Sequence, residues 1–152
     1  MLKFPKKSHR KHIKIPRKSI RLAELFGIIF GDGGQRFGIP RWIERNSGFE
    51  KAFVRGLMDT DGCFYTHRYV VCNKNYYNLG LCFASFSQKL IESVARIFIK
   101  NGIEPHFANK RRWICLYSNV AQQTYLRVFG SSNPRIFEKR RHWEFWRGVR
   151  VV

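Results

Sequence analysis

The sequence holds only three aspartates, Asp32, Asp59 and Asp61, and all of them lie in two short segments that resemble each other. Residues 25–33 are LFGIIFGDG and residues 54–62 are VRGLMDTDG. Each segment is an apolar, helix-like stretch that ends in Asp-Gly. A single Asp-Gly pair is an ordinary way to end a helix. Two aligned copies in a chain with 29 Lys and Arg against 10 Asp and Glu indicate a shared chemical role instead.

Small residues recur every four positions in both segments, so each predicted helix has one face of small side chains. Such faces let two helix backbones approach closely. If the two helices pack along these faces, Asp32 and Asp61 lie near the helix–helix interface. The negative ends of both helix dipoles point to the same place. These charges repel unless a cation lies between them, and Mg²⁺ or Mn²⁺ prefers such oxygen ligands. Beside a phosphate, that ion would activate water and stabilise the leaving oxygen. The predicted interface residues are Gly27, Gly31, Gly56 and Thr60.

The charge balance predicts a polyanionic partner. The formal net charge is +19, although the charged fraction of 26% is ordinary, because acidic residues are scarce. Nucleic acid is the first expectation, since each neutralised phosphate releases counterions. A membrane surface is the competing interpretation, but no segment combines a basic face with a clean apolar face. No apolar run is long enough to span a membrane, and the first residues lack a signal peptide's apolar stretch.

The same observations predict an intracellular protein of the cytoplasm or nucleoid, with an organelle as the alternative, and no membrane partner. The four cysteines, Cys63, Cys72, Cys82 and Cys115, form no CxxC pair, which excludes zinc-finger and zinc-ribbon classes. We expect them to be buried, reduced thiols.

The order of elements follows from hydrophobic spacing and turn residues. Two motif helices are predicted at 22–34 and 49–61, with a short connector helix from Pro40 between them. Strands are predicted at 63–72 and 76–86 through a turn at 73–75, and at 104–108 and 112–117 through a turn at 109–111. Helices from Ser87 to Asn101 and over 119–129 complete the pattern. The expected divisions are a basic arm (1–21), the first motif helix and connector helix (22–52), an αββαββα unit (53–133) and a basic C-terminal tail (134–152).

Both segments resemble the two motifs of the LAGLIDADG homing endonucleases, and the second does so very closely. Residues 39–43, IPRWI, are similar to the family's usual lead-in to a motif. The resemblance covers about residues 19–142 and implies an α+β fold: an αββαββα unit with a four-stranded antiparallel saddle sheet, plus an extra N-terminal motif helix. It implies DNA binding by the saddle and cleavage of both strands with a divalent metal. Asp32 and Asp61 match the catalytic, metal-binding aspartates, whereas Phe30 stands where the second motif has Asp59, a position that varies in the family.

One departure from the family pattern leaves the function open. Only a connector and one short helix separate the two motifs, where two-motif members have a whole ββαββα unit. A single sheet would cover about half of a typical site. The chain is then either a metal-dependent endonuclease on double-stranded DNA, working as a homodimer, or a non-catalytic binding module. The second class includes an RNA maturase, a ribonucleoprotein component that binds structured RNA, and a DNA-binding regulator; an RNA-binding protein of unrelated fold is a third alternative.

Candidate nucleic-acid contacts lie on the sheet, its turns and the two basic ends. Strand alternation gives two sets on the first strand, Tyr65, His67 and Tyr69 or Thr66 and Arg68, and core packing is the alternative for the tyrosines. Residues at the turns should contact phosphates, and Lys110 is also a candidate for charge stabilisation near the scissile phosphate. The arm and tail should add affinity without sequence preference. The phosphate-contacting candidates are Lys74, Lys110, Arg111 and Arg112 at the turns and Lys139, Arg140 and Arg141 in the tail.

Overall fold

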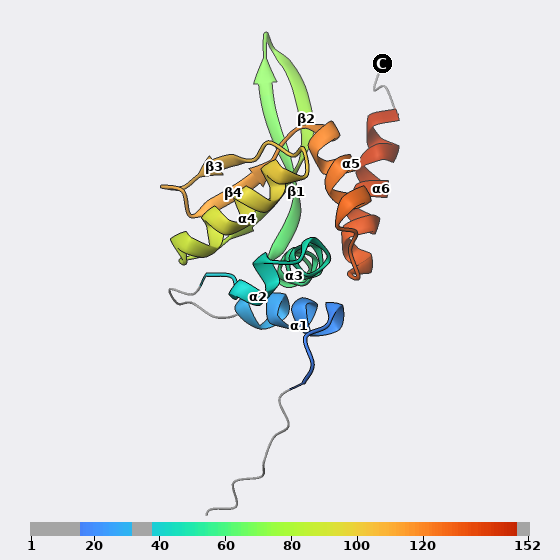
Figure 1. The fold of residues 1–152 in the computed structure, drawn as a ribbon. Helices are drawn as coiled ribbons and strands as arrows, with labels where there is room; N and C mark the ends of the chain where they lie inside the picture. Colours follow the sequence, from blue (N-terminus) through green and yellow to red (C-terminus); the bar gives the residue numbers. More distant parts are fainter. Residues whose placement is uncertain (1–15, 32–37, 149–152) are drawn as a thin grey trace, which may run out of the picture.

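A computed structural model of the protein describes residues 16–31 and 38–148. The predicted α+β fold is confirmed, and the order of elements from the second motif helix onward is αββαββα (Figure 1). The elements are α1 (Ile20–Gly31), α2 (Arg41–Glu44), α3 (Ser47–Thr60), β1 (Gly62–Val71), β2 (Lys74–Ala84), α4 (Gln88–Lys100), β3 (His106–Ala108), β4 (Trp113–Leu116), α5 (Asn119–Val128) and α6 (Pro134–Gly148).

Polar side chains just before three helices fix where those helices begin. The side chain of Asn46 accepts a hydrogen bond from the Phe49 N–H (3.1 Å), which starts α3 and places Gly48 in its first turn. Ser87 and Ser118 cap α4 and α5 in the same way. Each cap satisfies an N–H group that has no partner within its helix.

The sheet is antiparallel with the strand order β1-β2-β4-β3. The β1–β2 hairpin turns through Cys72 and Asn73, which both have positive φ (49° and 60°), since Val71 pairs with Lys74. The predicted hairpin is therefore present, but its turn lies one residue earlier than the expected 73–75, and Lys74 is the first residue of β2. Figure 1 shows this hairpin reaching well beyond the rest of the sheet.

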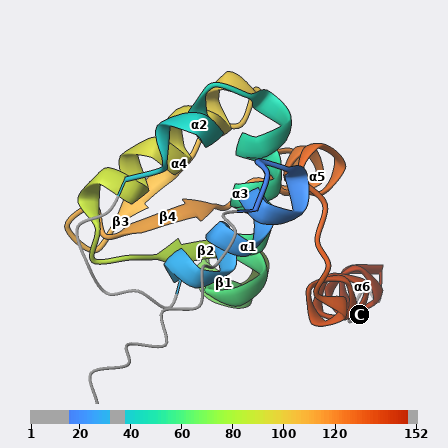
Figure 2. The same ribbon diagram turned by 60° about the horizontal axis from the view of Figure 1, so that its bottom comes forward.

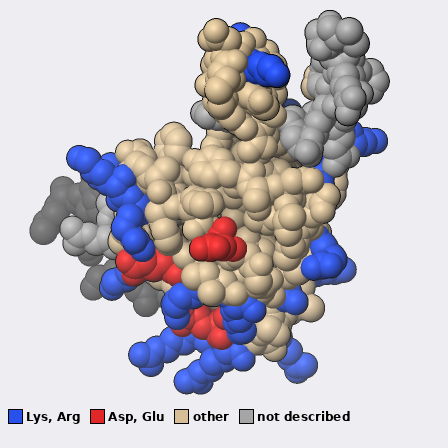
Figure 3. Space-filling model, turned by 90° about the horizontal axis from the view of Figure 1, so that it is seen from above, with Lys and Arg blue, Asp and Glu red and all other residues tan. Residues whose placement is uncertain are grey.

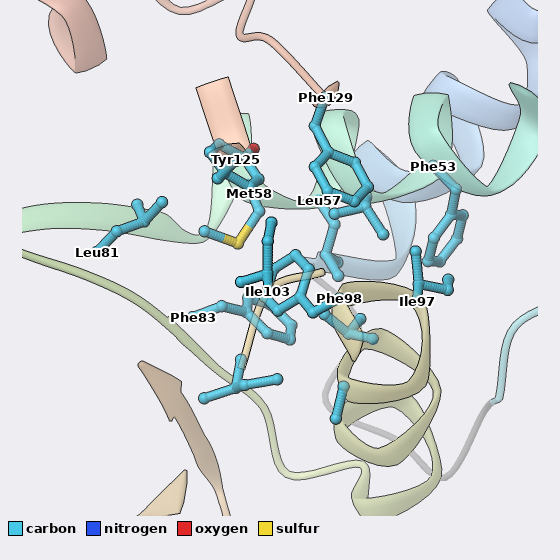
Figure 4. Packing of buried hydrophobic residues seen from close by; sticks show 14 of the residues in the cluster. Phe53, Leu57, Met58, Leu81, Phe83, Ile97, Phe98, Ile103, Tyr125 and Phe129 are labelled. Atoms are coloured by element: carbon cyan, nitrogen blue, oxygen red, sulfur yellow. The ribbon is translucent and has the colours of Figure 1, made fainter. Parts of the chain in front are cut away.

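One face of the sheet packs on the helices, and this contact fixes which strand residues point where. Leu81 and Phe83 from β2 meet Leu57 of α3 and Phe98 of α4 in the buried cluster shown in Figure 4. Because Phe64 on β1 pairs with Leu81, even-numbered positions of β1 share this helix-side face. Of the two predicted sets, Thr66 and Arg68 therefore lie on the helix side, and Tyr65, His67 and Tyr69 lie on the opposite face.

Residues 134–148 form helix α6, so the expectation of a C-terminal tail there is wrong. Pro134 is the first helical residue, and the Asn133 side chain accepts a hydrogen bond from the Arg135 N–H (3.1 Å). Ile136 is buried, and α6 runs beside the β1 edge of the sheet (Figures 1 and 2). Basic and aromatic residues alternate irregularly along this helix, so it lacks the one-sided apolar stripe on which the sequence prediction depends.

The cysteine prediction holds for two of the four thiols. Cys82 and Cys115 are buried, whereas Cys63 and Cys72 are exposed, because one lies on the edge strand β1 and the other in the hairpin turn. Within the described ranges, no helix has both the length and the apolar character needed to cross a bilayer.

Candidate functional site

The two motif helices meet backbone to backbone within one chain, and Figures 1 and 2 both place α1 against α3. A Cβ atom added at Gly27 would lie 2.1 Å from the Phe53 carbonyl oxygen and 2.9 Å from the Leu57 nitrogen. A Cβ atom at Gly56 would lie 2.2 Å from the Glu24 carbonyl oxygen. A side chain at either position, Gly27 on α1 or Gly56 on α3, would prevent this approach. The first motif helix thus covers the Gly56 face of the second.

The other two predicted interface residues lie further along each helix. Thr60 is exposed, and its hydroxyl donates to the carbonyl oxygens of Gly56 and Leu57 (both 3.1 Å), so its polar group is engaged by its own helix. Gly31 is the last residue of α1. Gly27 and Gly56 are thus two positions at which the backbones of α1 and α3 are in close contact.

Asp61 sits where α3 ends and β1 begins. Its N–H donates to the Leu57 carbonyl oxygen (3.0 Å), which closes the last turn of α3, and its side chain is half-buried. The chain then turns so sharply that a Cβ atom at Gly62 would lie 2.4 Å from the Met58 carbonyl oxygen. Asp32, the other predicted ligand, lies outside the described residues, directly after the end of α1.

The surroundings of Asp61 fit one ligand of a hard divalent cation. A half-buried carboxylate at the negative end of a helix dipole supplies the oxygen and charge that Mg²⁺ or Mn²⁺ prefers. In the described part of the chain, no group of three or more His, Cys, Asp or Glu side chains could hold a metal. A metal at Asp61 would therefore need Asp32 and oxygens from the nucleic acid or water.

Asp59 has a structural role that the sequence did not reveal. Its carboxylate accepts hydrogen bonds from the Ser131 hydroxyl and from the Ser132 N–H (2.7 Å), and its carbonyl oxygen accepts one from the Asn133 side chain (3.0 Å). These three residues form the loop that leads into α6. A carboxylate near the start of a helix also interacts favourably with the helix dipole. Asp59 thus ties α6 to the second motif helix.

An ion pair joins α1 and α3 beside the glycine contact. The Arg55 guanidinium donates to both oxygens of Glu24 (2.9 and 2.5 Å), and the Ser132 hydroxyl donates to the same carboxylate (3.3 Å). The hydrogen bonds from Arg55 hold the pKa of Glu24 below its ordinary value. No local pattern in the sequence indicates this pair, because its two partners lie in different helices.

The sheet face opposite α3, α4 and α5, here called the saddle face, carries aromatic side chains. Register assigns to it alternate residues of all four strands. The Tyr65 ring lies against Gly80, where an added Cβ atom would be 2.6 Å from the ring, and Tyr65 hydrogen-bonds to Tyr117. Burial, then this hydrogen bond, raises the pKa of Tyr65. By backbone register, the positions on the saddle face are Cys63, Tyr65, His67, Tyr69, Val71, Lys74, Tyr76, Asn78, Gly80, Cys82, Ala84, His106, Ala108, Trp113, Cys115 and Tyr117.

Two buried thiols lie in the middle of the saddle face. Cys82 and Cys115 are direct cross-strand partners, and their sulfur atoms are 3.2 Å apart. The hydrogen bond between them, assisted by the hydroxyls of Tyr117 and Tyr65, lowers the pKa of Cys115 to about 6.

Most predicted phosphate contacts are exposed at the rim of the sheet. Lys74 lies at the start of β2, and Lys110 and Arg111 lie in the β3–β4 turn, where three successive residues from Asn109 have positive φ (47°, 53° and 62°). The Arg111 guanidinium lies over the Phe107 ring (4.1 Å) and that of Arg112 over the Phe86 ring (5.2 Å). These stacking contacts hold both cations at the surface.

The basic residues of α6 differ in exposure. The Lys139 ammonium donates to the Phe64 carbonyl oxygen on the β1 edge (3.2 Å), and Arg140 is half-buried beside Asn119. Arg141 is exposed. The basic arm up to residue 15 lies outside the described residues.

Comparison with known proteins gives one decisive match. The family model described as a LAGLIDADG-like domain matches residues 48–140, from the first turn of α3 into α6. The chain belongs to the LAGLIDADG-like domain family. This family comprises nucleic-acid-binding proteins of the homing endonuclease and maturase type. No curated protein matches the chain. Helix α1, which carries the first motif, precedes the matched residues.

Proposed function

We propose that this LAGLIDADG protein is a metal-dependent, site-specific DNA endonuclease of the intron or intein homing type. The observation that supports it best is the backbone contact of α1 and α3 at Gly27 and Gly56. Each contact glycine lies five residues before an aspartate, Asp32 or Asp61, so the packing pairs two equivalent motifs within one chain. An intracellular location stays a prediction that follows from this activity.

The chain's own residues have distinct tasks in this mechanism. Asp61 and Asp32 would hold Mg²⁺ or Mn²⁺, which when bound supplies Lewis-acid chemistry at a phosphodiester. The exposed cations of the sheet rim position the nucleic-acid backbone, and Lys110 would offset charge near the scissile phosphate. In the view of Figure 3, Lys and Arg side chains stand mainly along the edges, while Asp and Glu side chains lie at the centre and in the lower part of an otherwise uncharged surface.

A homodimer on the ligand belongs to the same proposal. The described residues contain one four-stranded sheet, so a second chain would supply the other half of the saddle. Because α1 covers the Gly56 face of α3, the two chains would meet through another surface.

A non-catalytic binding module is the second candidate, and one observation favours it. The described part of the chain has both motif helices but half of a saddle, so nucleic acid would lie across a single sheet rather than between two. Such a module could serve as an RNA maturase, a ribonucleoprotein component or a DNA-binding regulator.

Plasmid nicking separates the two candidates. Supercoiled plasmid carrying random-sequence inserts is incubated with the full chain and Mg²⁺ or Mn²⁺, with EDTA as the control. The endonuclease proposal predicts conversion to nicked or linear plasmid only with metal, and loss of that conversion in Asp32→Asn. Binding of the same plasmid without conversion in either metal would contradict cleavage and support the binding module.

A further inference from the structure

We propose that Cys63, Cys82 and Cys115, here called the thiol row, form a redox relay that ends in a reversible disulfide between Cys82 and Cys115. The oxidant is a peroxide from solution, and the resting state is the reduced form, in which all three cysteines are free. The relay goes beyond the proposed function. One consequence of it, protection of the thiol row by bound DNA, rests on that function.

The thiol row crosses three neighbouring strands of the saddle face. Cys63 on β1 is the direct partner of Cys82 on β2, and Cys82 is the direct partner of Cys115 on β4. Direct partners in an antiparallel sheet have Cα atoms roughly 4.5–5.5 Å apart, within the range of about 4.4–6.8 Å that a disulfide spans. The sulfur atoms of Cys82 and Cys115 are already 3.2 Å apart. Either neighbouring pair can therefore be bridged with little movement of the strands.

Exposure sets the order in which the three thiols meet an oxidant. Cys63 is exposed on β1, which is an edge strand of the sheet. Cys82 is 6% exposed and Cys115 is 0% exposed. A peroxide from solvent therefore reaches Cys63 first, and the inner pair is oxidised through it.

The oxidation takes three steps. The Cys63 sulfur attacks one peroxide oxygen, the O–O bond breaks, and a sulfenic acid forms as water leaves. The Cys82 sulfur then attacks the sulfenic sulfur, its proton leaves with the hydroxyl group as a second water, and a Cys63–Cys82 disulfide forms. Finally the Cys115 sulfur attacks the sulfur of Cys82, and Cys63 takes up the proton that Cys115 gives up and returns to the thiol. In sum, two thiols are oxidised to one disulfide, and one peroxide is reduced to two waters.

The arrangement of the strands favours the last exchange. Because β1 and β4 lie on opposite sides of β2, the Cys115 sulfur approaches Cys82 from the side opposite to the departing Cys63 sulfur. Displacement at sulfur follows such a line. The hydrogen bond from Cys82 lowers the pKa of Cys115, and the hydroxyls of Tyr117 and Tyr65 lower it as well and stay in place after the first disulfide has formed. Cys115 is therefore available as the thiolate, which is the attacking form.

Bound DNA would cover the thiol row. All three residues lie on the saddle face, where the proposed function holds the duplex. A duplex on that face covers Cys63, through which the peroxide enters the relay. The DNA-bound protein is then kept reduced, whereas the free protein is open to oxidation.

Peptide mapping under non-reducing conditions tests the relay. The reduced full chain is treated with hydrogen peroxide and blocked with iodoacetamide at successive times. EDTA prevents metal-catalysed oxidation, and a low protein concentration limits pairing between chains. We expect one main disulfide, which joins the peptides of Cys82 and Cys115 and is lost on treatment with dithiothreitol.

Matched variants locate the entry point of the oxidant. Cys63→Ser should slow the formation of the Cys82–Cys115 disulfide, because the exposed thiol of the row is missing. Cys72→Ser is the control and should be oxidised at the wild-type rate, since Cys72 is also exposed but lies in the hairpin turn, outside the row. Cys115→Ser should lose the inner disulfide and accumulate the Cys63–Cys82 intermediate. Thermal melting confirms that each reduced variant is folded.

Two results would overturn the relay. One is a wild-type chain in which Cys82 and Cys115 stay reduced while the exposed thiols are oxidised. The other is formation of the inner disulfide in Cys63→Ser as fast as in Cys72→Ser.

Repeating the oxidation on DNA-bound protein tests the protection. With the chain saturated by duplex DNA, as measured by fluorescence anisotropy, the inner disulfide should form more slowly than without DNA. An unchanged rate would contradict the cover by DNA, and with it the position of the duplex on the saddle face. No step of the relay needs cleavage, so a chain that fails to nick plasmid but shows the relay and the protection would contradict the endonuclease alone.

Discussion

Asp59 and Asp61 lie two residues apart in one motif, yet their surroundings differ. The Asp59 carboxylate accepts hydrogen bonds from Ser131 and Ser132, which ties it to the protein. Asp61 lies at the end of α3, where its N–H closes the last turn of the helix and its side chain is half-buried. The motif pattern makes Asp61 a candidate metal ligand, which stays a prediction, whereas no sequence pattern could reveal partners of Asp59 that lie 72 and 73 residues away.

Gly56→Ala should destabilise the protein. In an isolated helix this change gains up to about 1 kcal/mol, because glycine is a poor helix former. Here the new methyl group would lie 2.2 Å from the Glu24 carbonyl oxygen, so the two backbones must separate. We expect a net loss of about 1–3 kcal/mol in the free energy of unfolding. Chemical denaturation measures it.

Gly38→Ala is the matched control for this substitution. A Cβ atom at Gly38 would lie 3.8 Å from the Lys89 Cβ atom, an ordinary van der Waals distance. Equal stability of Gly56→Ala and Gly38→Ala would show that α1 and α3 are not in backbone contact.

Glu24→Gln should lower stability in a pH-dependent manner. The pKa of Glu24 is lowered in the folded state, chiefly by the hydrogen bonds from Arg55. Its contribution is therefore fully present above the ordinary value of 4.5 and is lost as the pH falls through the lowered folded-state pKa. We expect a cost of about 1 kcal/mol at neutral pH, since the pair is partly exposed.

Thermal melting of wild type and Glu24→Gln across a pH series checks this sign. The difference between them should be constant at neutral pH and shrink in acid. A difference that grows as the pH falls would contradict the ion pair.

At the scale of elements, most of the architecture was predictable because local signals agree with tertiary packing. Ser87 and Ser118 cap helices at the expected places, and the apolar alternation of β1 and β2 gives their pairing. Which residues of β1 face away from the helices was not predictable, because both alternating sets contain polar or aromatic residues. Pairing of Phe64 with the buried Leu81 decides it.

Helix α6 escaped prediction because its stability depends on contacts distant in sequence. Asp59 holds the loop before it, and Lys139 bonds to the β1 edge. The irregular spacing of its aromatic residues gave no helical period. Its position beside β1 supplies a donor, the Lys139 ammonium, to the Phe64 carbonyl oxygen on that edge of the sheet.

Asp59→Ala should release the start of α6. The substitution removes the acceptors of the Ser131 hydroxyl and the Ser132 N–H. We expect faster hydrogen exchange in the first turn of α6 and a loss of about 1–3 kcal/mol in stability. Hydrogen exchange with mass spectrometry measures the first effect peptide by peptide. Asp59→Asn, which keeps an acceptor oxygen, should show a smaller change; unaltered exchange in Asp59→Ala would mean that other contacts hold α6.

At the scale of the whole molecule, composition and motif order predicted the ligand class and the family. A net charge of +19 predicts a polyanion, and the match over residues 48–140 shows the LAGLIDADG-like domain family. The partner arrangement was not predictable. Whether α1 packs on its own chain or on a second one depends on tertiary contacts, and both choices place the same glycines at a helix interface.

Stoichiometry tests the homodimer. Light scattering of the protein with excess nucleic acid should show two chains on one ligand, since one sheet covers half of the predicted site. A complex that contains one 18.1 kDa chain would contradict the dimer. Because α1 already occupies the Gly56 face, that result would favour the binding module.

The most direct test of the central claim compares cleavage and affinity in Asp61→Asn. The variant keeps the shape of the side chain and removes the negative charge that would hold the metal and repel phosphate. Nicking and anisotropy are measured on the same plasmid-derived target, beside wild type. The account predicts that metal-dependent nicking is lost while affinity stays the same or rises. Nicking at the wild-type rate by a folded Asp61→Asn protein would contradict it.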